Sequence, residues 1–475
     1  MAFDLRQTLA EHAPRAHELF ADHVNPRLAG VLRTIGFNRH FTRAEGAYLW
    51  DERGDRYLDF LGGYAVCNVG RNHPDVKAAL RDALEMDLPS MVQFDAPPLA
   101  AALARELQRR VGRGLDRAYF TNSGTEGIEA AIKFARCATG RPAVLFAERG
   151  FHGLTLGSLS LNGCQSFRQG FAPFLPETRM VRFGDLADLE GALRAGDVAA
   201  FVVEPVQGKG VHVAPEGYLE EASRLCHRHG ALLVADEVQT GVCRTGRFLA
   251  IDHSPACEPD IVVLSKALSG GMVPVGAVLC GRRTWDRVYS SMDRAIVHSS
   301  TFHMGALAMA AGLAVLHACD AGRLAERAGR MGALLRDGLE RLRERYEYVR
   351  AVRQRGLMVA VEFGEPRSWH LRASWRAMHA MEPDLFAQAA VIPLFEDHRI
   401  LCQVAGHGQP TVKFVPPLVI GEGDVAYFLE AFESVLRRMH GMAGPAPDLL
   451  ARLARNSLSR RTFEAATADS AGALP

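Results

Sequence analysis

The sequence predicts an α/β protein built around a doubly wound, mostly parallel sheet. Between about residues 99 and 310, short apolar runs rich in β-branched residues alternate with segments of helical periodicity. The chain has 475 residues, which is long enough for two or three domains with large cores. Its content of 48% hydrophobic and 23% charged residues is typical of a globular protein.

Charge and cysteine usage exclude several classes of protein. A formal net charge of +1 gives no electrostatic reason to expect nucleic acid or a membrane as partner. The longest apolar runs are too short to span a bilayer, and residues 1–20 lack the continuous apolar segment of a secretory signal. The nine cysteines show neither C-x-x-C pairs nor metal-ligand spacing. We therefore expect reduced thiols, a cytoplasmic location and no metal site.

The elements follow in chain order. Residues 1–45 are predicted to be helical and irregular, and residues 47–74 alternate apolar and polar side chains around an R-G-D-R turn, which predicts a small β-meander. Six strands of the main sheet are expected at RAYFTN, PAVLFAE, AAFVVEPV, ALLVADEV, IVVLSKA and GAVLCG.

The C-terminal part has a different pattern. Residues 305–346 predict long helices, the second of them rich in Arg and Glu. Further strands are expected in YVRAVRQRGLMVAVEFG and TVKFVPPLVIG, followed by an amphipathic helix in GDVAYFLEAFESVLRRMH. Functional residues of a doubly wound sheet belong at the carboxyl ends of its strands, where loops enter helices.

One such strand end is FTNSGTEG at residues 120–127. Helix amides that begin near Gly124 and Thr125 would attract an anion, and Ser123 and Thr125 add hydroxyl donors. The same residue types are also ordinary helix caps, so the motif alone leaves both interpretations open. It is neither a P-loop nor G-x-G-x-x-G, which speaks against nucleoside triphosphates and dinucleotides.

A second strand end, ALLVADEVQTG, carries Asp236 and Glu237. A carboxylate there is costly unless a cation or donor meets it, so Asp236 either faces a protonated heterocyclic nitrogen or serves as a cap or ion-pair partner. Lys266 follows 30 residues later at the end of another strand, and it is one of only five lysines among 55 Lys and Arg residues. Unlike arginine, lysine can lose its proton and act as a nucleophile.

A phosphate cradle, a buried carboxylate and a strand-end lysine together describe a site for pyridoxal 5′-phosphate. The lysine forms a Schiff base with the cofactor aldehyde, and the aspartate keeps the ring nitrogen protonated so that the ring accepts electrons from the substrate Cα.

Seven motifs in order carry a resemblance to a known family. They are YLDFLGGYAVCNVGRNHP, TNSGTEGIEAAIKFAR, GFHGLTLGSLS, VVEPVQG, DEVQTG, LSKALSGG and STF. With these, roughly residues 25–440 closely resemble the class III pyridoxal-phosphate aminotransferases, the ornithine, acetylornithine and ω-amino-acid transaminase group. The resemblance implies fold-type I: a large domain at 91–310 and a small α+β domain built from both chain ends. The latter comprises residues 1–90 in part and residues 311–440, with an insertion at about 365–405. The Ala/Pro/Ser-rich tail, 441–475, is expected to be poorly ordered.

The resemblance also implies an obligate homodimer and a role for each motif residue. Gly124 and Thr125 would bind the phosphate, Phe151 would stack on the ring with His152 beside it, and Asp236 would pair with the ring nitrogen. Val238 would pack behind the ring, Gln239 would approach its hydroxyl, and Glu204 would support Gln239. Lys266 would be both the Schiff-base lysine and the acid–base group. Thr301 would reach the phosphate of the partner subunit. Without the resemblance, Phe151 would be taken for a core aromatic and Thr301 for an ordinary loop hydroxyl.

Departures from the family pattern bear on the substrate. Ornithine-type, acetylornithine-type and γ-aminobutyrate-type members read F-x-G-R-T, whose arginine binds a substrate carboxylate, but Leu154 stands there in FHGLT. A leucine cannot pair with a carboxylate, so an apolar or carboxylate-free acceptor is favoured. Lys209 occupies the position of an acidic gate, and Lys413 that of the arginine which the gate masks. Lys413 is expected to hold the α-carboxylate of an amino-acid donor; the alternative is neutral drift at 413 and solvent exposure at 209. Tyr64 is expected in the pocket wall.

The insertion at about 365–405 is rich in Trp, Phe, Met and Leu. It suits either an extended apolar pocket or an extra packed helix. Its appearance resembles aminotransferase domains of secondary-metabolite pathways such as prodiginine assembly, which aminate hydrophobic aldehydes.

The sequence thus predicts a pyridoxal-phosphate aminotransferase that moves an amino group from an amino-acid or ω-amine donor to an aldehyde or ketone. Rivals are an aminomutase, decarboxylase or racemase of the same family, and, more remotely, a non-catalytic pyridoxal-phosphate-binding protein. A nicotinamide-linked dehydrogenase lacks its glycine fingerprint here.

Overall fold

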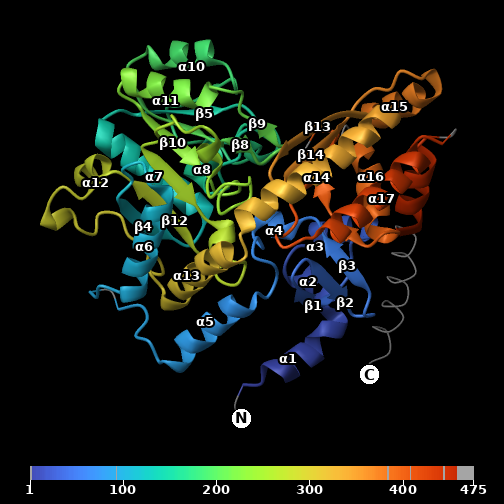
Figure 1. Cartoon of the computed structure of the whole chain (residues 1–475), viewed down its shortest axis with the longest axis horizontal. Helices are drawn as coiled ribbons and strands as arrows, with labels where there is room; N and C mark the ends of the chain where they lie inside the picture. The colour runs from blue at the N-terminus through green and yellow to red at the C-terminus, as the bar shows by residue number, and fades with distance from the viewer. Residues whose placement is uncertain (1–2, 93, 382–384, 407, 442–443, 457–475) are drawn as a thin grey trace.

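A seven-stranded sheet forms the centre of the computed structural model, which describes residues 3–92, 94–381, 385–406, 408–441 and 444–456 (Figure 1). Its strand order is β4-β12-β11-β10-β7-β5-β6. The strands are β4 (Arg117–Thr121), β5 (Ala143–Ala147), β6 (Thr178–Val181), β7 (Val198–Val203), β10 (Leu232–Asp236), β11 (Ile261–Leu264) and β12 (Gly276–Cys280). β12 runs antiparallel to both of its neighbours, and the other pairs are parallel.

The mostly parallel sheet confirms the predicted fold class, and all six predicted strands are present. The additional strand is β6 at the sheet edge. Its sequence, Thr-Arg-Met-Val, has no apolar run, because an edge strand exposes more of its surface than a central one.

Helices cover both faces of this sheet, as a doubly wound fold requires. Along β7, Ala200 and Val202 belong to one hydrophobic cluster, whereas Phe201 and Val203 belong to another. The first cluster includes Ile128 of α7 (Gly124–Thr139), and the second includes residues of α11 (Tyr218–Arg228). Because successive side chains of a strand point to opposite faces, β7 is buried from both sides and carries no polar residue.

Strands from the N-terminal and C-terminal parts of the chain meet in a small four-stranded sheet (Figure 1). The predicted meander is formed by β1 (Phe41–Glu45), β2 (Tyr48–Asp51) and β3 (Arg56–Asp59), and β15 (Ile400–Leu401) pairs parallel with β3. A second sheet has the order β13 (Val349–Arg355), β14 (Met358–Phe363), β17 (Thr411–Phe414) and β16 (Gln403–Val404). A two-stranded ribbon joins β8 (Val206–Gln207) to β9 (His212–Val213).

The remaining helices mostly follow the predicted order. The N-terminal helices are α1 (Leu5–His12), α2 (Ala16–His23) and α3 (Pro26–Thr34), and the predicted long helices are α13 (Ala306–Ala321) and α14 (Leu324–Arg345). The predicted final amphipathic helix is α17 (Glu422–Met439), whose buried residues recur at helical spacing. No single helix in the described ranges is long and apolar enough to cross a membrane. Helices α13 and α14 meet the length and composition criteria only when taken together, and they are bent by 60° relative to each other.

Two expectations about local structure were wrong. Residues 41–45 form a strand, where a helical and irregular segment was expected, because they pair with residues 48–51 of the meander. The tail is not wholly irregular: residues 446–456 form a helix. Arg452 of this helix is 7% exposed and pairs with Glu396 at 2.6 Å and Asp397 at 2.7 Å, which ties the helix to residues 396–397. Residues 457–475 lie outside the described residues.

The insertion contains α15 (Trp369–Met381) and α16 (Leu385–Glu396). Nine of the twelve residues of α16 are buried, most of them in the main hydrophobic cluster, so this part of the chain follows the packed-helix alternative. Only its end, at residues 403–406, reaches the large cavity described next.

Candidate active site

A cavity of about 1120 Å³ opens at the carboxyl edge of the central sheet. It gathers fourteen of the fifteen predicted site residues: Tyr64, Ser123, Gly124, Thr125, Phe151, His152, Leu154, Glu204, Lys209, Asp236, Val238, Gln239, Lys266 and Lys413. Parallel strands end at one edge, so motifs far apart in sequence converge there.

Strand β11 ends at Leu264, and Lys266 follows two residues later. The backbone φ of Lys266 is 44°. A left-handed conformation is uncommon for a residue with a side chain and is found at functional sites. Burial lowers the pKa of the Lys266 amine below its ordinary value, although the charges of Asp236 and Glu204 act in the opposite direction. The lowered pKa favours the neutral amine, which is the nucleophilic form.

Asp236 is the last residue of β10, the strand next to β11. It is 3% exposed; its Oδ1 accepts the Val238 N–H at 3.0 Å, and its Oδ2 lies 2.7 Å from His152 Nδ1. Burial opposes protonation of His152, but the hydrogen bond and charge of Asp236, together with Glu204, raise the pKa of His152 above its ordinary value. These contacts fix the position of the Asp236 carboxyl group in the cavity wall.

The neighbouring carboxylate, Glu237, serves the fold instead. It accepts hydrogen bonds from the backbone N–H groups of Ala250 at 3.0 Å and Ile251 at 2.8 Å and from the Thr240 hydroxyl. Burial raises the pKa of Glu237 to about 7. Of the two adjacent acids, only Asp236 faces the cavity.

Helix α7 begins at Gly124 and directs its first backbone N–H groups toward the cavity edge. Ser123 is the N-cap of α7, and its hydroxyl accepts a hydrogen bond from the Glu126 N–H at 3.3 Å. Ser123 therefore acts as a helix cap, as one of the two interpretations expected. Thr125 Oγ1 lies 2.7 Å from Thr155 Oγ1 and 2.6 Å from Ser158 Oγ. A Cβ on Gly124 would come within 2.7 Å of Val238 Cγ1, which explains the glycine at this close approach.

Glu204 holds the loop that carries Phe151. Its Oε1 accepts the Phe151 N–H at 2.9 Å and its Oε2 accepts the Gly208 N–H at 2.7 Å, and burial raises its pKa. Glu204 and Gln239 were expected to lie close together. Both side chains lie beside Gly208: a Cβ at this residue would be 2.7 Å from Gln239 Oε1 and 3.1 Å from Glu204 Oε2.

Lys413, on β17, is only 3% exposed although it lines the cavity. Its Nζ donates to the Gly208 carbonyl at 2.8 Å and to Gln239 Oε1 at 3.3 Å. Burial, reinforced by the charges of Lys209 and Lys266, lowers the pKa of Lys413 to about 7. The side chain is therefore bonded to the protein and close to neutrality.

Lys209 is not a solvent-exposed side chain. Its Nζ lies 4.6 Å from the ring centroid of Phe167 and 5.2 Å from that of Phe151, within the range of cation–π attraction. Burial lowers its pKa. Phe167, on α9 (Gln165–Arg168), was missed by the sequence reasoning, because nothing in its local sequence marks it as a cavity residue.

Leu154 and Tyr64 form exposed parts of the cavity wall, each with an exposed fraction of 54%. Tyr64 has φ of 64° in a left-handed turn, and its carbonyl accepts the Gln239 Nε2–H at 3.3 Å. Val31 of α3 and Met272 also line the cavity and were not predicted.

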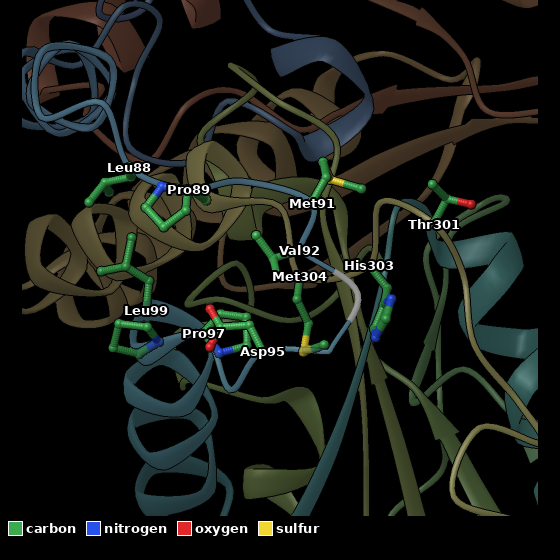
Figure 2. A pocket seen from close by; sticks show the side chains of 12 residues that line it. Leu88, Pro89, Met91, Val92, Asp95, Pro97, Leu99, Thr301, His303 and Met304 are labelled. Atoms are coloured by element: carbon green, nitrogen blue, oxygen red, sulfur yellow. The ribbon is translucent and has the colours of Figure 1, made fainter.

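Thr301 does not line this cavity. It is exposed and borders a smaller pocket with Leu88, Pro89, Met91 and Met304 (Figure 2). In the single chain, Thr301 is therefore separate from the other fourteen predicted residues.

Comparisons with known proteins agree with this geometry. The chain matches the family described as aminotransferase class III over residues 34–436. Aminotransferase PigE of a Serratia species is 33% identical over 444 residues, which are 87% of this chain and 52% of that protein. The chain therefore spans about half the length of that relative. Acetylornithine aminotransferase of Methanopyrus kandleri is 38% identical over 394 residues, 83% of this chain and 93% of that protein.

Solved structures confirm the predicted fold-type I architecture. Ornithine aminotransferase of Toxoplasma gondii has a TM-score of 0.75 and 31% identity over 84% of this chain and 91% of that one. A second structure of that enzyme, with TM-score 0.74, 32% identity and the same coverage, contains pyridoxal phosphate at partial occupancy. An (S)-enantioselective ω-transaminase of Thermomicrobium roseum has a TM-score of 0.78 and 28% identity over 93% and 100% of the two chains.

Proposed function

The chain belongs to the class III aminotransferases, a family of pyridoxal-phosphate enzymes, and from this we propose how its cavity works and what it accepts. The reaction transfers an amino group from an amino-acid or ω-amine donor to an aldehyde or ketone whose chain is largely apolar. The observation that carries the proposal is the placement of Lys266 and Asp236 at the ends of adjacent strands in one cavity.

The residues present fit pyridoxal 5′-phosphate. Its ring, when bound, accepts electrons from the substrate Cα. The N-terminus of α7, at Gly124 and Thr125, would hold the phosphate, because helix amides favour an anion. Asp236, fixed by His152 and the Val238 N–H, would keep a ring N–H protonated. Phe151 and Val238 would pack against opposite faces of the ring, and Gln239 would approach its hydroxyl.

Lys266 would bind the cofactor carbonyl carbon through its amine and then hold and deliver a proton beside the substrate carbon. A lysine with a lowered pKa suits both tasks, since burial favours the neutral amine that attacks a carbonyl carbon and accepts a proton. Glu204 would act by positioning, because its two oxygens hold the Phe151 and Gly208 amides.

The apolar part of the wall supports the acceptor class. Leu154, Phe167 and Met272 line the cavity, and Leu154 offers no partner for a carboxylate. Lys413 is proposed to meet the α-carboxylate of an amino-acid donor, since it lies beside Gln239 and has one more N–H than its two observed bonds use.

We also propose a cytoplasmic homodimer in which Thr301 contributes to the partner's site. Apolar side chains are strongly exposed on the segments around Thr301 and residues 84–94, including Phe94 at 97%, Met292 at 95% and Phe302 at 64%. Such a patch is typical of an interface. All nine cysteines are free, as a reducing compartment permits.

Product analysis tests the reaction. The purified enzyme is incubated with an amine donor and an aldehyde of increasing chain length, and both products are quantified. A transaminase forms one new amine for each donor consumed. Product formation without a second carbonyl substrate would instead indicate an aminomutase, decarboxylase or racemase. Cofactor absorbance with no turnover on any pair would indicate the non-catalytic alternative.

A further inference from the structure

The cavity contains one lysine, Lys209, to which the proposed function assigns no role. Three of the five lysines line it: Lys209, Lys266 and Lys413. The carboxylates that line it are Glu204 and Asp236. Glu204 accepts two backbone N–H bonds, and Asp236 is bonded to His152 and the Val238 N–H. Throughout the part of the chain that the structure describes, none of the three lysines forms an ion pair with a carboxylate.

The three lysines differ in what their amines contact. Lys266 is committed to the cofactor, and Lys413 donates to the Gly208 carbonyl and to Gln239. The Lys209 amine, by contrast, lies over the rings of Phe167 and Phe151, at 4.6 and 5.2 Å from their centroids. Within the described residues, no oxygen accepts a hydrogen bond from it. Aromatic faces attract a cation but leave its N–H donors without acceptors.

The side chain of Lys209 is held in this place from two directions. Its Cδ lies 3.2 Å from the position that a Cβ on Gly406 would occupy, so its stem lies beside Gly406 in the cavity wall. Its amine lies over the aromatic rings of Phe151 and Phe167. The cation is therefore placed in advance on the same side of the cavity as the Phe151–Leu154 loop, where Leu154 leaves the wall uncharged.

We propose that Lys209 binds a carboxylate of the substrate, at the end of the substrate chain remote from the reacting amine or carbonyl. Phe167 and Leu154 contact the apolar chain that precedes this carboxylate. Leu154 provides no positive charge for a carboxylate, and Lys209 provides it from a different segment of the chain. This inference rests on the proposed function, and it adds ω-carboxylates to the apolar substrates that the cavity accepts.

The experiment measures binding and not turnover. Hexanoate and its neutral counterpart hexanamide carry neither a reactive amine nor a ketone or aldehyde, and their Kd values for the holoenzyme are obtained by calorimetry. We expect the wild-type enzyme to prefer hexanoate by about tenfold or more, because a charged hydrogen bond is made in a half-buried site. The preference is expected to disappear in Lys209→Met and in Lys209→Gln, and to persist in Lys209→Arg.

Matched variants separate the possible outcomes. Lys77→Met makes the same chemical change at an exposed residue of α5 (Pro74–Glu85) and is expected to keep the preference. Adding Leu154→Arg to Lys209→Met is expected to restore it. Loss of the preference in Lys413→Met but not in Lys209→Met, or absence of any preference in the wild type, would overturn the assignment to Lys209. Because no turnover is needed, failure of this test is distinct from failure of the proposed reaction, which the product analysis reports.

Discussion

The two walls of the cavity are built differently. On the cofactor wall, Asp236, Lys266 and Gly124 stand at the ends of β10 and β11 and at the start of α7. Their positions follow directly from the sheet. On the substrate wall, Tyr64, Leu154, Lys209 and Lys413 come from four separate segments, and Lys209 and Lys413 are held by contacts with other loops. The first wall is set by topology, and the second by long-range side-chain packing.

The difference predicts how the two walls respond to mutation. Changes on the cofactor wall are expected to affect every substrate, because all substrates react at the same atoms. Changes on the substrate wall are expected to alter the ranking of substrates while the reaction itself persists.

The largest effect is expected from Lys266→Ala. If Lys266 has the proposed roles of covalent anchor and proton carrier, loss of its amine should lower transamination by at least about 10³-fold with every donor and acceptor. Single-turnover measurement of cofactor absorbance and product checks this. Lys77→Ala, at an exposed lysine of α5, is the control and should retain activity. A Lys266→Ala enzyme with a tenth of the wild-type rate would contradict the role assigned to Lys266.

A smaller but equally general effect is expected from Asp236→Asn. The amide keeps the shape but loses the charge that faces the ring, so kcat should fall about 10²-fold for all substrates. The change should also be visible without cofactor. With the carboxylate gone, only the charge of Glu204 opposes the effect of burial, so the pKa of His152 should fall. Titration of the His152 ring by NMR measures this shift; an unchanged pKa would show that Asp236 does not control His152.

The same difference explains how much the sequence could predict. Asp236 and Lys266 follow largely buried apolar runs, and a run of this kind in alternation with helices can be placed in a parallel sheet without knowledge of its contacts. The edge strand β6 lacks such a run and was missed. The role of Glu237 as a structural carboxylate was equally invisible, since it depends on amides of residues 250 and 251.

On the substrate wall the sequence identified positions but not their environments. Leu154, Lys209 and Lys413 stood out as departures from a family pattern, and all three line the cavity. Exposure of Lys209 to solvent was a reasonable expectation for a lysine in a Gly-rich loop. The aromatic contact with Phe167 depends on how α9 folds back over the loop, and no local pattern encodes that.

On the substrate wall, Leu154→Arg should change specificity in two opposite directions. A guanidinium at this exposed position would pair with a distal carboxylate, so kcat/KM for donors that carry one should rise about tenfold. For long apolar aldehydes it should fall, because the arginine brings charge into their path. Steady-state kinetics with both substrate types measures the two changes. Leu154→Met, which conserves volume and polarity, is the matched control. Parallel changes for both substrate types would mean that residue 154 affects the fold or cofactor instead of the substrate.

The smallest predicted effect concerns the pH dependence of donor selection, and it tests whether Lys413 meets a carboxylate. Because burial lowers the pKa of Lys413 to about 7, this side chain is an ammonium below that pH and a neutral amine above it. The ratio of kcat/KM for a carboxylate-bearing donor to that for a carboxylate-free amine should therefore decrease as the pH rises through about 7. The decrease should be larger the more strongly the bound carboxylate favours the ammonium, up to about tenfold per pH unit. In Lys413→Arg the guanidinium stays protonated, so the ratio should be flat over the same range. A titration that changes kcat/KM equally for both donors, such as that of Lys266, cancels in this ratio. An equal pH dependence in the wild type and Lys413→Arg would limit Lys413 to holding Gln239 and the Gly208 carbonyl, and the substrate wall would then bind anions through Lys209 alone.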